Sequence, residues 1–101
     1  MLVNPLFRYH WGVPKESLSE AVAANVTKLL REERKKRGLS MNVLAQRAGL
    51  SHSIISLVER DLRSPSLDTM LRLAEALDAD LGKIITQAEE IVHEHRKQRK
   101  R

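Results

Sequence analysis

The sequence contains no cysteine, which excludes disulfide bonds and metal sites built on thiolates. Aromatic residues are nearly absent as well, because Phe7, Tyr9 and Trp11 are the only ones and all precede residue 12. The core must therefore be aliphatic. No apolar run approaches the roughly 20 residues that cross a bilayer, and the first residues lack the basic-then-apolar order of a signal peptide. These absences predict a cytoplasmic protein without a membrane partner.

What the chain has in excess is positive charge. A length of 101 residues fits one domain, and a hydrophobic content of 42% favours a folded chain over a disordered one. The net charge of +5 favours a polyanionic partner. The basic residues gather around one central stretch and at the end of the chain, at Arg31, Arg34 to Arg37, Arg60, Arg63 and Arg96 to Arg101.

Residues 1–16 form a distinct amino-terminal arm. In it Phe7, Tyr9, Trp11 and Val13 alternate with Arg8, His10 and Gly12, the period-2 pattern of an extended segment with one apolar face. A single strand is unstable alone, so this face is expected to pack on its own domain or on a partner subunit. The sequence leaves both possibilities open.

Serine caps, glycine stops and apolar stripes predict five helices after the arm. Ser17 and Glu20 have the spacing of a capping box that opens the first helix, and Gly38 is placed to end it. The serines expected to cap the next three helices are Ser40, Ser51 and Ser66. The residues expected to face the core are Leu18, Val22, Val26, Leu29 and Leu30 in the first helix, Val43 and Leu44 in the second, and Leu67, Met70, Leu71, Ala74 and Leu77 in the fourth.

The central stretch, residues 38–61, reads as two short helices joined by a tight corner. Ala45 permits close helix approach, Gly49 suits a left-handed corner, and Ser51 can cap the following helix. Ile55 and Val58 would then lie on the inner face of the second helix. This spacing is that of a helix-turn-helix, whose second helix can enter a DNA major groove. A small helical bundle with a glycine corner is the simpler alternative.

Four blocks of sequence together resemble the Xre-like, or lambda-repressor-like, helix-turn-helix family of bacterial and phage regulators. The blocks are LREERKKRGLS (30–40), LAQRAGLS (44–51), IISLVERD (54–61) and SPSLDTMLRLAEAL (64–77). The resemblance covers about residues 26–87 and implies an all-α, five-helix DNA-binding domain over residues 17–92, with its motif at 41–60. The arm at 1–16, a lengthened fifth helix and a basic tail at 93–101 are additions to it.

The resemblance also assigns roles to individual residues. It implies base contacts from the start of the third helix, by Ser51, His52, Ser53, Ser56 and Leu57. It implies phosphate contacts by Ser40, Met41 (main chain), Asn42, Arg60, Arg63 and Ser64. It implies a structural ion pair between Arg34 and Glu59.

Two positions depart from the family pattern. Met41 stands where a phosphate-anchoring Gln is common, and Asp61 stands where Gly often follows the recognition helix. Asp tolerates the left-handed conformation, but its charge is expected to point toward DNA unless a neighbour neutralises it, and Arg60 and Arg63 are the adjacent candidates. No base-reading position carries Arg or Gln, so DNA shape is expected to supply more of the specificity.

The fifth helix has a longer apolar stripe than one small core needs. We expect its outer half to form a homodimer seam, or alternatively to pack only on its own domain. The stripe consists of Leu81, Ile84, Ile85, Ala88, Ile91 and Val92. The tail that follows is expected either to extend this helix or to contact DNA phosphates.

No pattern of residues predicts catalysis, a metal or another cofactor. His93 and His95 are two apart and would point to different faces of a helix.

Taken together, the motif and the resemblance predict a dimeric, nucleoid-associated transcriptional regulator, acting as a repressor on a palindromic operator. The alternative is an antitoxin-like or bridging subunit that keeps the fold and binds a protein partner through the arm.

Overall fold

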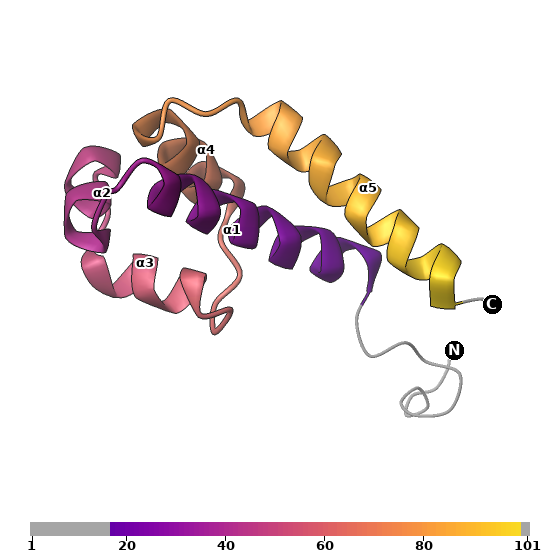
Figure 1. Cartoon of the computed structure of the whole chain (residues 1–101). Coiled ribbons are helices and arrows are strands. Elements are labelled where there is room, and N and C mark those ends of the chain that lie inside the picture. Colours follow the sequence, from indigo (N-terminus) through magenta and orange to yellow (C-terminus); the bar gives the residue numbers. More distant parts are fainter. Residues whose placement is uncertain (1–16, 100–101) are drawn as a thin grey trace, which may run out of the picture.

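The computed structural model describes residues 17–99, which fold into five helices with no strand among them (Figure 1). The helices are α1 (Leu18–Lys36), α2 (Met41–Ala48), α3 (His52–Glu59), α4 (Leu67–Ala76) and α5 (Leu81–Arg99). The predicted all-α, five-helix class is confirmed. The aromatic arm at 1–16 lies outside the described residues. Within the described part, no helix combines the length and the apolar character needed to traverse a bilayer.

Serine hydroxyls cap the first four helices, as their spacing predicts. The Glu20 amide donates to the Ser17 hydroxyl at 3.2 Å, and the Ser17 amide donates to the Glu20 carboxylate at 3.0 Å, which completes a capping box. Single caps of the same kind lie at Ser40, Ser51 and Ser66, each accepting from the amide three residues later at 3.1 to 3.2 Å. These bonds satisfy amide groups that the first helical turn leaves unpaired.

The same four helices end on a left-handed residue, at Gly38, Gly49, Asp61 and Asp78. After α3, for example, the Asp61 amide donates to the Val58 carbonyl and the Leu62 amide to the Leu57 carbonyl, at 3.0 and 2.9 Å. This pair of bonds is a Schellman motif. It turns the chain sharply at each helix end and so fixes the angles between successive helices.

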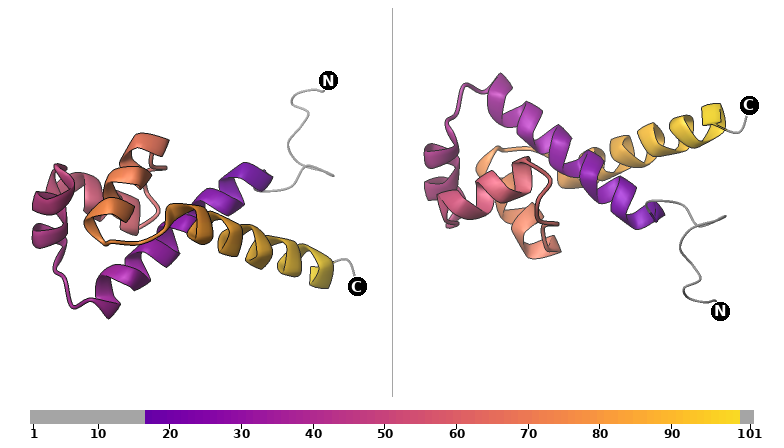
Figure 2. Two further views of the ribbon diagram at one scale, coloured as in Figure 1. Left: turned by 90° about the horizontal axis from the view of Figure 1, so that it is seen from above. Right: turned by 90° about the horizontal axis from the view of Figure 1, so that it is seen from below.

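Helix α1 is the central element of the fold. It contacts α3, α4 and α5, and its longest contact is with α5. Helices α2 and α3 lie together at one end of the molecule, and α5 projects from the other (Figure 1). Figure 2 shows that α1 and α5 cross, so the amino end of α1 and the carboxyl end of α5 diverge. The fully buried side chains at the centre include Val26, Ile55 and Leu77.

The apolar stripe expected for α4 is wrong in register. Leu67 and Leu71 are 60% and 51% exposed, whereas Leu73, which the prediction left out, is buried beside Ala74 and Leu77. Apolar residues cover a wide arc of this helix, and its contacts with α1, α2 and α5 bury one side of that arc. Two other residues expected in the core are also largely exposed, Leu18 at 44% and Val43 at 36%.

The dimer seam expected on α5 also needs correction. Leu81, Ile84, Ala88 and Val92 are all less than 9% exposed within the single chain, because this side of α5 packs along α1. These four side chains are therefore not available to a second subunit. Ile85 and Ile91 are only half-buried. The helix continues through the first part of the tail, as far as Arg99.

Candidate nucleic-acid interface

The corner between α2 and α3 is built from three residues with different tasks. Gly49 adopts φ +68°, a conformation that costs an L side chain free energy. The next amide, of Leu50, donates to the carbonyl of Ala45 at 2.9 Å and closes the turn. Ala45 itself is only 4% exposed, so a larger side chain there would separate the two helices. The corner is the one predicted from the sequence.

Helix α3 divides into a buried and an exposed side. Ile55 and Val58 are 1% and 2% exposed and hold the helix against the core. At its amino end Ser51, His52 and Ser53 are all exposed. The other two residues assigned to base contacts, Ser56 and Leu57, are half-buried. The described part of the chain thus leaves the first turn of α3 open to a ligand.

The residues expected to contact phosphates lie at two places, the start of α2 and the segment that follows α3. Ser40 and Asn42 are exposed at the start of α2, whereas the Met41 side chain packs against the core. Arg60, Arg63 and Ser64 are exposed in the segment that follows α3. The Met41 side chain cannot replace a phosphate-binding Gln, but the amides at the start of α2 point out of the helix end.

A buried ion pair joins α3 to α1. The Arg34 guanidinium donates to both carboxylate oxygens of Glu59, at 2.7 and 2.9 Å, and the two side chains are 12% and 9% exposed. The predicted contact is therefore present. Sequence reasoning missed a third bond, in which Arg34 donates to the Leu39 carbonyl at 2.7 Å. Arg34 thus fixes both α3 and the segment leading into α2.

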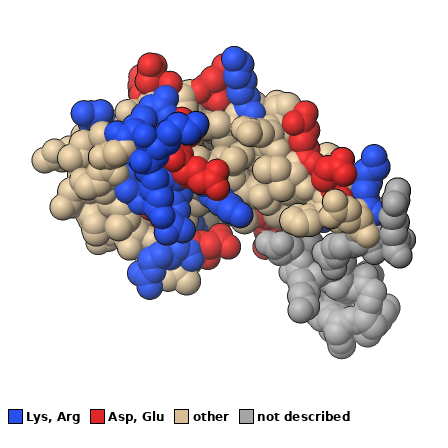
Figure 3. All heavy atoms as spheres, viewed as in Figure 1, with Lys and Arg blue, Asp and Glu red and all other residues tan. Residues whose placement is uncertain are grey.

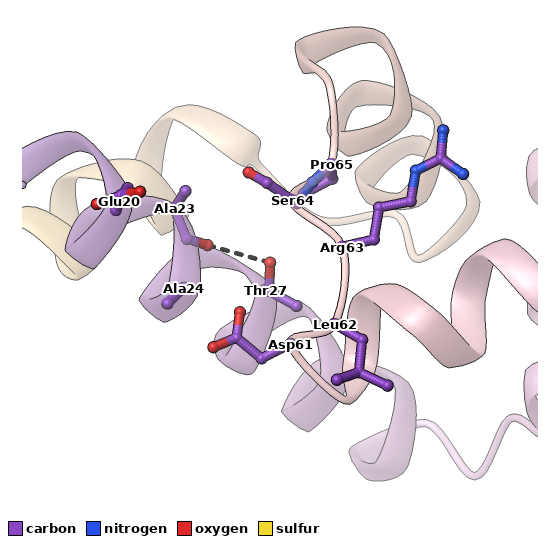
Figure 4. Close-up of a pocket in the computed structure, with 9 residues that line it drawn as sticks. All are labelled: Glu20, Ala23, Ala24, Thr27, Asp61, Leu62, Arg63, Ser64 and Pro65. Atoms are coloured by element: carbon purple, nitrogen blue, oxygen red, sulfur yellow. Dashed lines mark hydrogen bonds between the residues drawn. The ribbon is translucent and has the colours of Figure 1, made fainter. Parts of the chain in front are cut away.

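Asp61 does not point where the sequence suggested. Figure 4 shows its carboxylate on the α1 side of the loop, whereas the Arg63 side chain points away from α1. Its backbone adopts φ +58°, in the left-handed region. The negative charge that replaces the common Gly therefore faces a pocket beside α1.

Positive charge gathers on the same half of the molecule as α2 and α3. Figure 3 shows Lys and Arg in a band across the carboxyl-terminal half of α1. Part of this charge is compensated locally, since Lys36 and Arg37 hydrogen-bond to Glu33. These bonds hold the pKa of the Glu33 carboxyl below its ordinary value, with the Arg37 bond the larger cause. Within residues 17–99, no three His, Asp or Glu side chains gather where they could hold a metal ion.

A short helix held at a glycine corner with its first turn exposed defines the helix-turn-helix class of protein. A helix-turn-helix family model matches residues 30–84, which is more than half of the chain. The chain belongs to the Xre-like, lambda-repressor-like branch of that class, a family of DNA-binding transcriptional regulators.

Known relatives and solved structures agree with this membership. An uncharacterized HTH-type transcriptional regulator of Mycobacterium tuberculosis is 44% identical over 48 residues, 48% of this chain and 34% of that protein. The control protein C.SmaI of Serratia marcescens is 36% identical over 70 residues, 69% of this chain and 79% of that protein. The restriction-modification controller protein C.AhdI of Aeromonas hydrophila has a similar structure, with a TM-score of 0.57 and 38% identity over 62% of this chain and 94% of that one.

The match to the longer relatives is confined to one part of them. The chain spans about a third of the length of the Mycobacterium regulator and of PuuR of Escherichia coli, 34% in each case. The similarity therefore concerns the helix-turn-helix domain.

Proposed function

We propose that the chain is a transcriptional regulator that binds a specific DNA operator by inserting the start of α3 into the major groove. The observation that carries this proposal is the exposure of Ser51, His52 and Ser53 on a helix whose other side is locked into the core. Hydroxyl and imidazole groups can donate to or accept from base edges. Membership of the helix-turn-helix family and the names of its relatives support the same function.

We further propose that it acts as a homodimer on a palindromic operator and represses promoters that the operator overlaps, at the nucleoid. Dimeric helix-turn-helix proteins read two half-sites about one helical turn, ~34 Å, apart. The half-buried Ile85 and Ile91 on α5 are the apolar side chains of the expected seam that remain partly open to a second subunit.

Selection of bound fragments from a genomic DNA pool tests this function. We expect a shared sequence with two inverted half-sites centred one helical turn apart, and lower transcription from a promoter that contains it. Recovery of fragments without any shared sequence would contradict operator recognition. A shared sequence that contains only one half-site would contradict binding as a dimer but not operator recognition.

A further inference from the structure

A pocket of about 280 Å³ lies between the first half of α1 and the loop that follows α3 (Figure 4). Its α1 wall contains the small, half-buried Ala23 and Ala24, and its loop wall runs from Asp61 to Pro65. Pockets for drug-sized ligands enclose about 300 to 1,000 Å³. This one is below that range and suits one large side chain better than a free small molecule.

We propose that the occupant is the amino-terminal arm of the same chain, with the indole of Trp11 in the pocket. The arm joins the described structure at Ser17, and Ser17 is hydrogen-bonded to Glu20, which itself lines the pocket. Seven helical residues separate Ser17 from Ala24, a rise of ~10 Å. Six extended residues separate Trp11 from Ser17 and span up to ~20 Å, so the indole can reach back to the pocket.

Charge complementarity favours this occupant. The pocket is lined by two carboxylates, Glu20 and Asp61, and Asp61 forms no ion pair with another described residue. The Arg63 guanidinium points away from the pocket in Figure 4. Two cationic residues of the arm, Arg8 and Lys15, lie on either side of Trp11 in the sequence, and their side chains would face these carboxylates.

The docked arm would stabilise the loop that carries Arg63 and Ser64 without covering Arg63. Docking would also bury the aromatic side of the arm, which a single extended segment cannot bury by itself. The proposal does not depend on DNA binding, and its test needs no DNA.

Trp11 is the only tryptophan, so its fluorescence in the full chain reports the position of the arm directly. We expect acrylamide to quench it at least about twofold less than in urea, since a docked indole loses most of its accessible surface. Ala24→Arg fills the pocket with a bulky cation and should remove this protection. Gln87→Arg makes the matched change at an exposed position of α5 and should retain it.

A second measurement covers the case in which Ala24→Arg disturbs α1. Trp11→Ala changes none of the five described helices and should shift the backbone amide resonances of Ala23, Ala24 and Leu62, but not those near Gln87. Unchanged pocket resonances, or full quenching of Trp11 in the unaltered chain, would overturn the proposal. Protection that disappears on dilution would also overturn it, in favour of docking on a second copy.

Discussion

At the scale of single residues, the Arg34–Glu59 pair is the contact on which the position of α3 depends most. Both side chains are almost fully buried. The Arg34 guanidinium depends on Glu59 and on the Leu39 carbonyl for the hydrogen bonds that it loses from water, and the Glu59 carboxylate depends on Arg34, with the Arg31 guanidinium farther away at 3.8 Å. Removing one partner of a buried pair costs about 3–5 kcal/mol when the other charge is left without its hydrogen bonds. Arg31 is a weak substitute for Arg34 here, because its side chain is 47% exposed and lies 3.8 Å from Glu59.

We therefore expect Arg34→Met to lower the free energy of unfolding by about 3 kcal/mol or more, measured by urea denaturation. Arg34→Lys should recover little of this loss, because an ammonium cannot bind both carboxylate oxygens in the same planar geometry. The control is Arg72→Ala, which breaks an exposed pair with Asp68 and should cost less than about 1 kcal/mol. Equal losses at the two sites would show that the buried pair has no special role.

The left-handed glycines provide a second residue-scale prediction. Gly38 and Gly49 have φ near +67°, and a Cβ at Gly38 would meet no atom within 4 Å. Gly38→Ala therefore isolates the backbone cost, about 1–2 kcal/mol, or a fall in melting temperature of roughly 4–16 °C. Gly49→Ala should cost at least as much, because its Cβ would also approach Arg72 at 3.2 Å. Gly82→Ala, within α5, is the comparison: its Cβ would lie 3.3 Å from Asp80 Oδ1, so this side chain must move slightly, but the backbone is not left-handed and we expect a smaller loss. A fall as large as that of Gly38→Ala would contradict this explanation.

At the scale of helices, local signals predicted the structure well. Serine hydroxyls and left-handed residues act on neighbouring amides and carbonyls, so adjacent positions in the sequence predict their effect. The serine caps give the starts of the first four helices correctly. The register of α4 was not predictable in this way. Leu67, Leu71 and Leu73 are equally apolar, and the positions of the neighbouring helices determine which of them is buried.

The same limit applies to the apolar stripe of α5. An apolar stripe indicates that a helix face is covered, but it does not distinguish a neighbouring helix of the same chain from a second subunit. Here α1 covers most of it. The base-contact and phosphate-contact residues were proposed from family resemblance, and their exposure is compatible with those roles without testing them.

The proposed dimer makes an element-scale prediction about α5. Ile85→Glu or Ile91→Glu places a charge on a half-buried position, and we expect it to shift sedimentation from dimer to monomer, because burying an unpaired carboxylate is unfavourable. Gln87→Glu adds the same charge at an exposed position between them and should leave the dimer intact. An unchanged sedimentation profile in both isoleucine variants would show that α5 does not form the dimer interface.

At the scale of the whole molecule, the net charge of +5 and its uneven distribution predict salt-dependent DNA binding. Each phosphate contact contributes about 0.9 to the slope of log affinity against log salt concentration. Arg63→Gln, on the exposed loop after α3, should reduce that slope by about one, measured by fluorescence anisotropy. Lys83→Gln removes an equal charge from an exposed position of α5, away from the α2–α3 corner, and serves as the control. A slope that falls equally in both variants would indicate only a general effect of charge.

The central claim is that the first turn of α3 reads bases, and the affinity ratio between operator and random DNA tests it most directly. For the double variant His52→Ala with Ser53→Ala, we predict about a tenfold or greater fall in this ratio, since each base contact contributes roughly 1–3 kcal/mol of discrimination. Affinity for random DNA should change little, and His93→Ala on α5 should leave both affinities unchanged. An equal loss on operator and random DNA would contradict base reading by this helix.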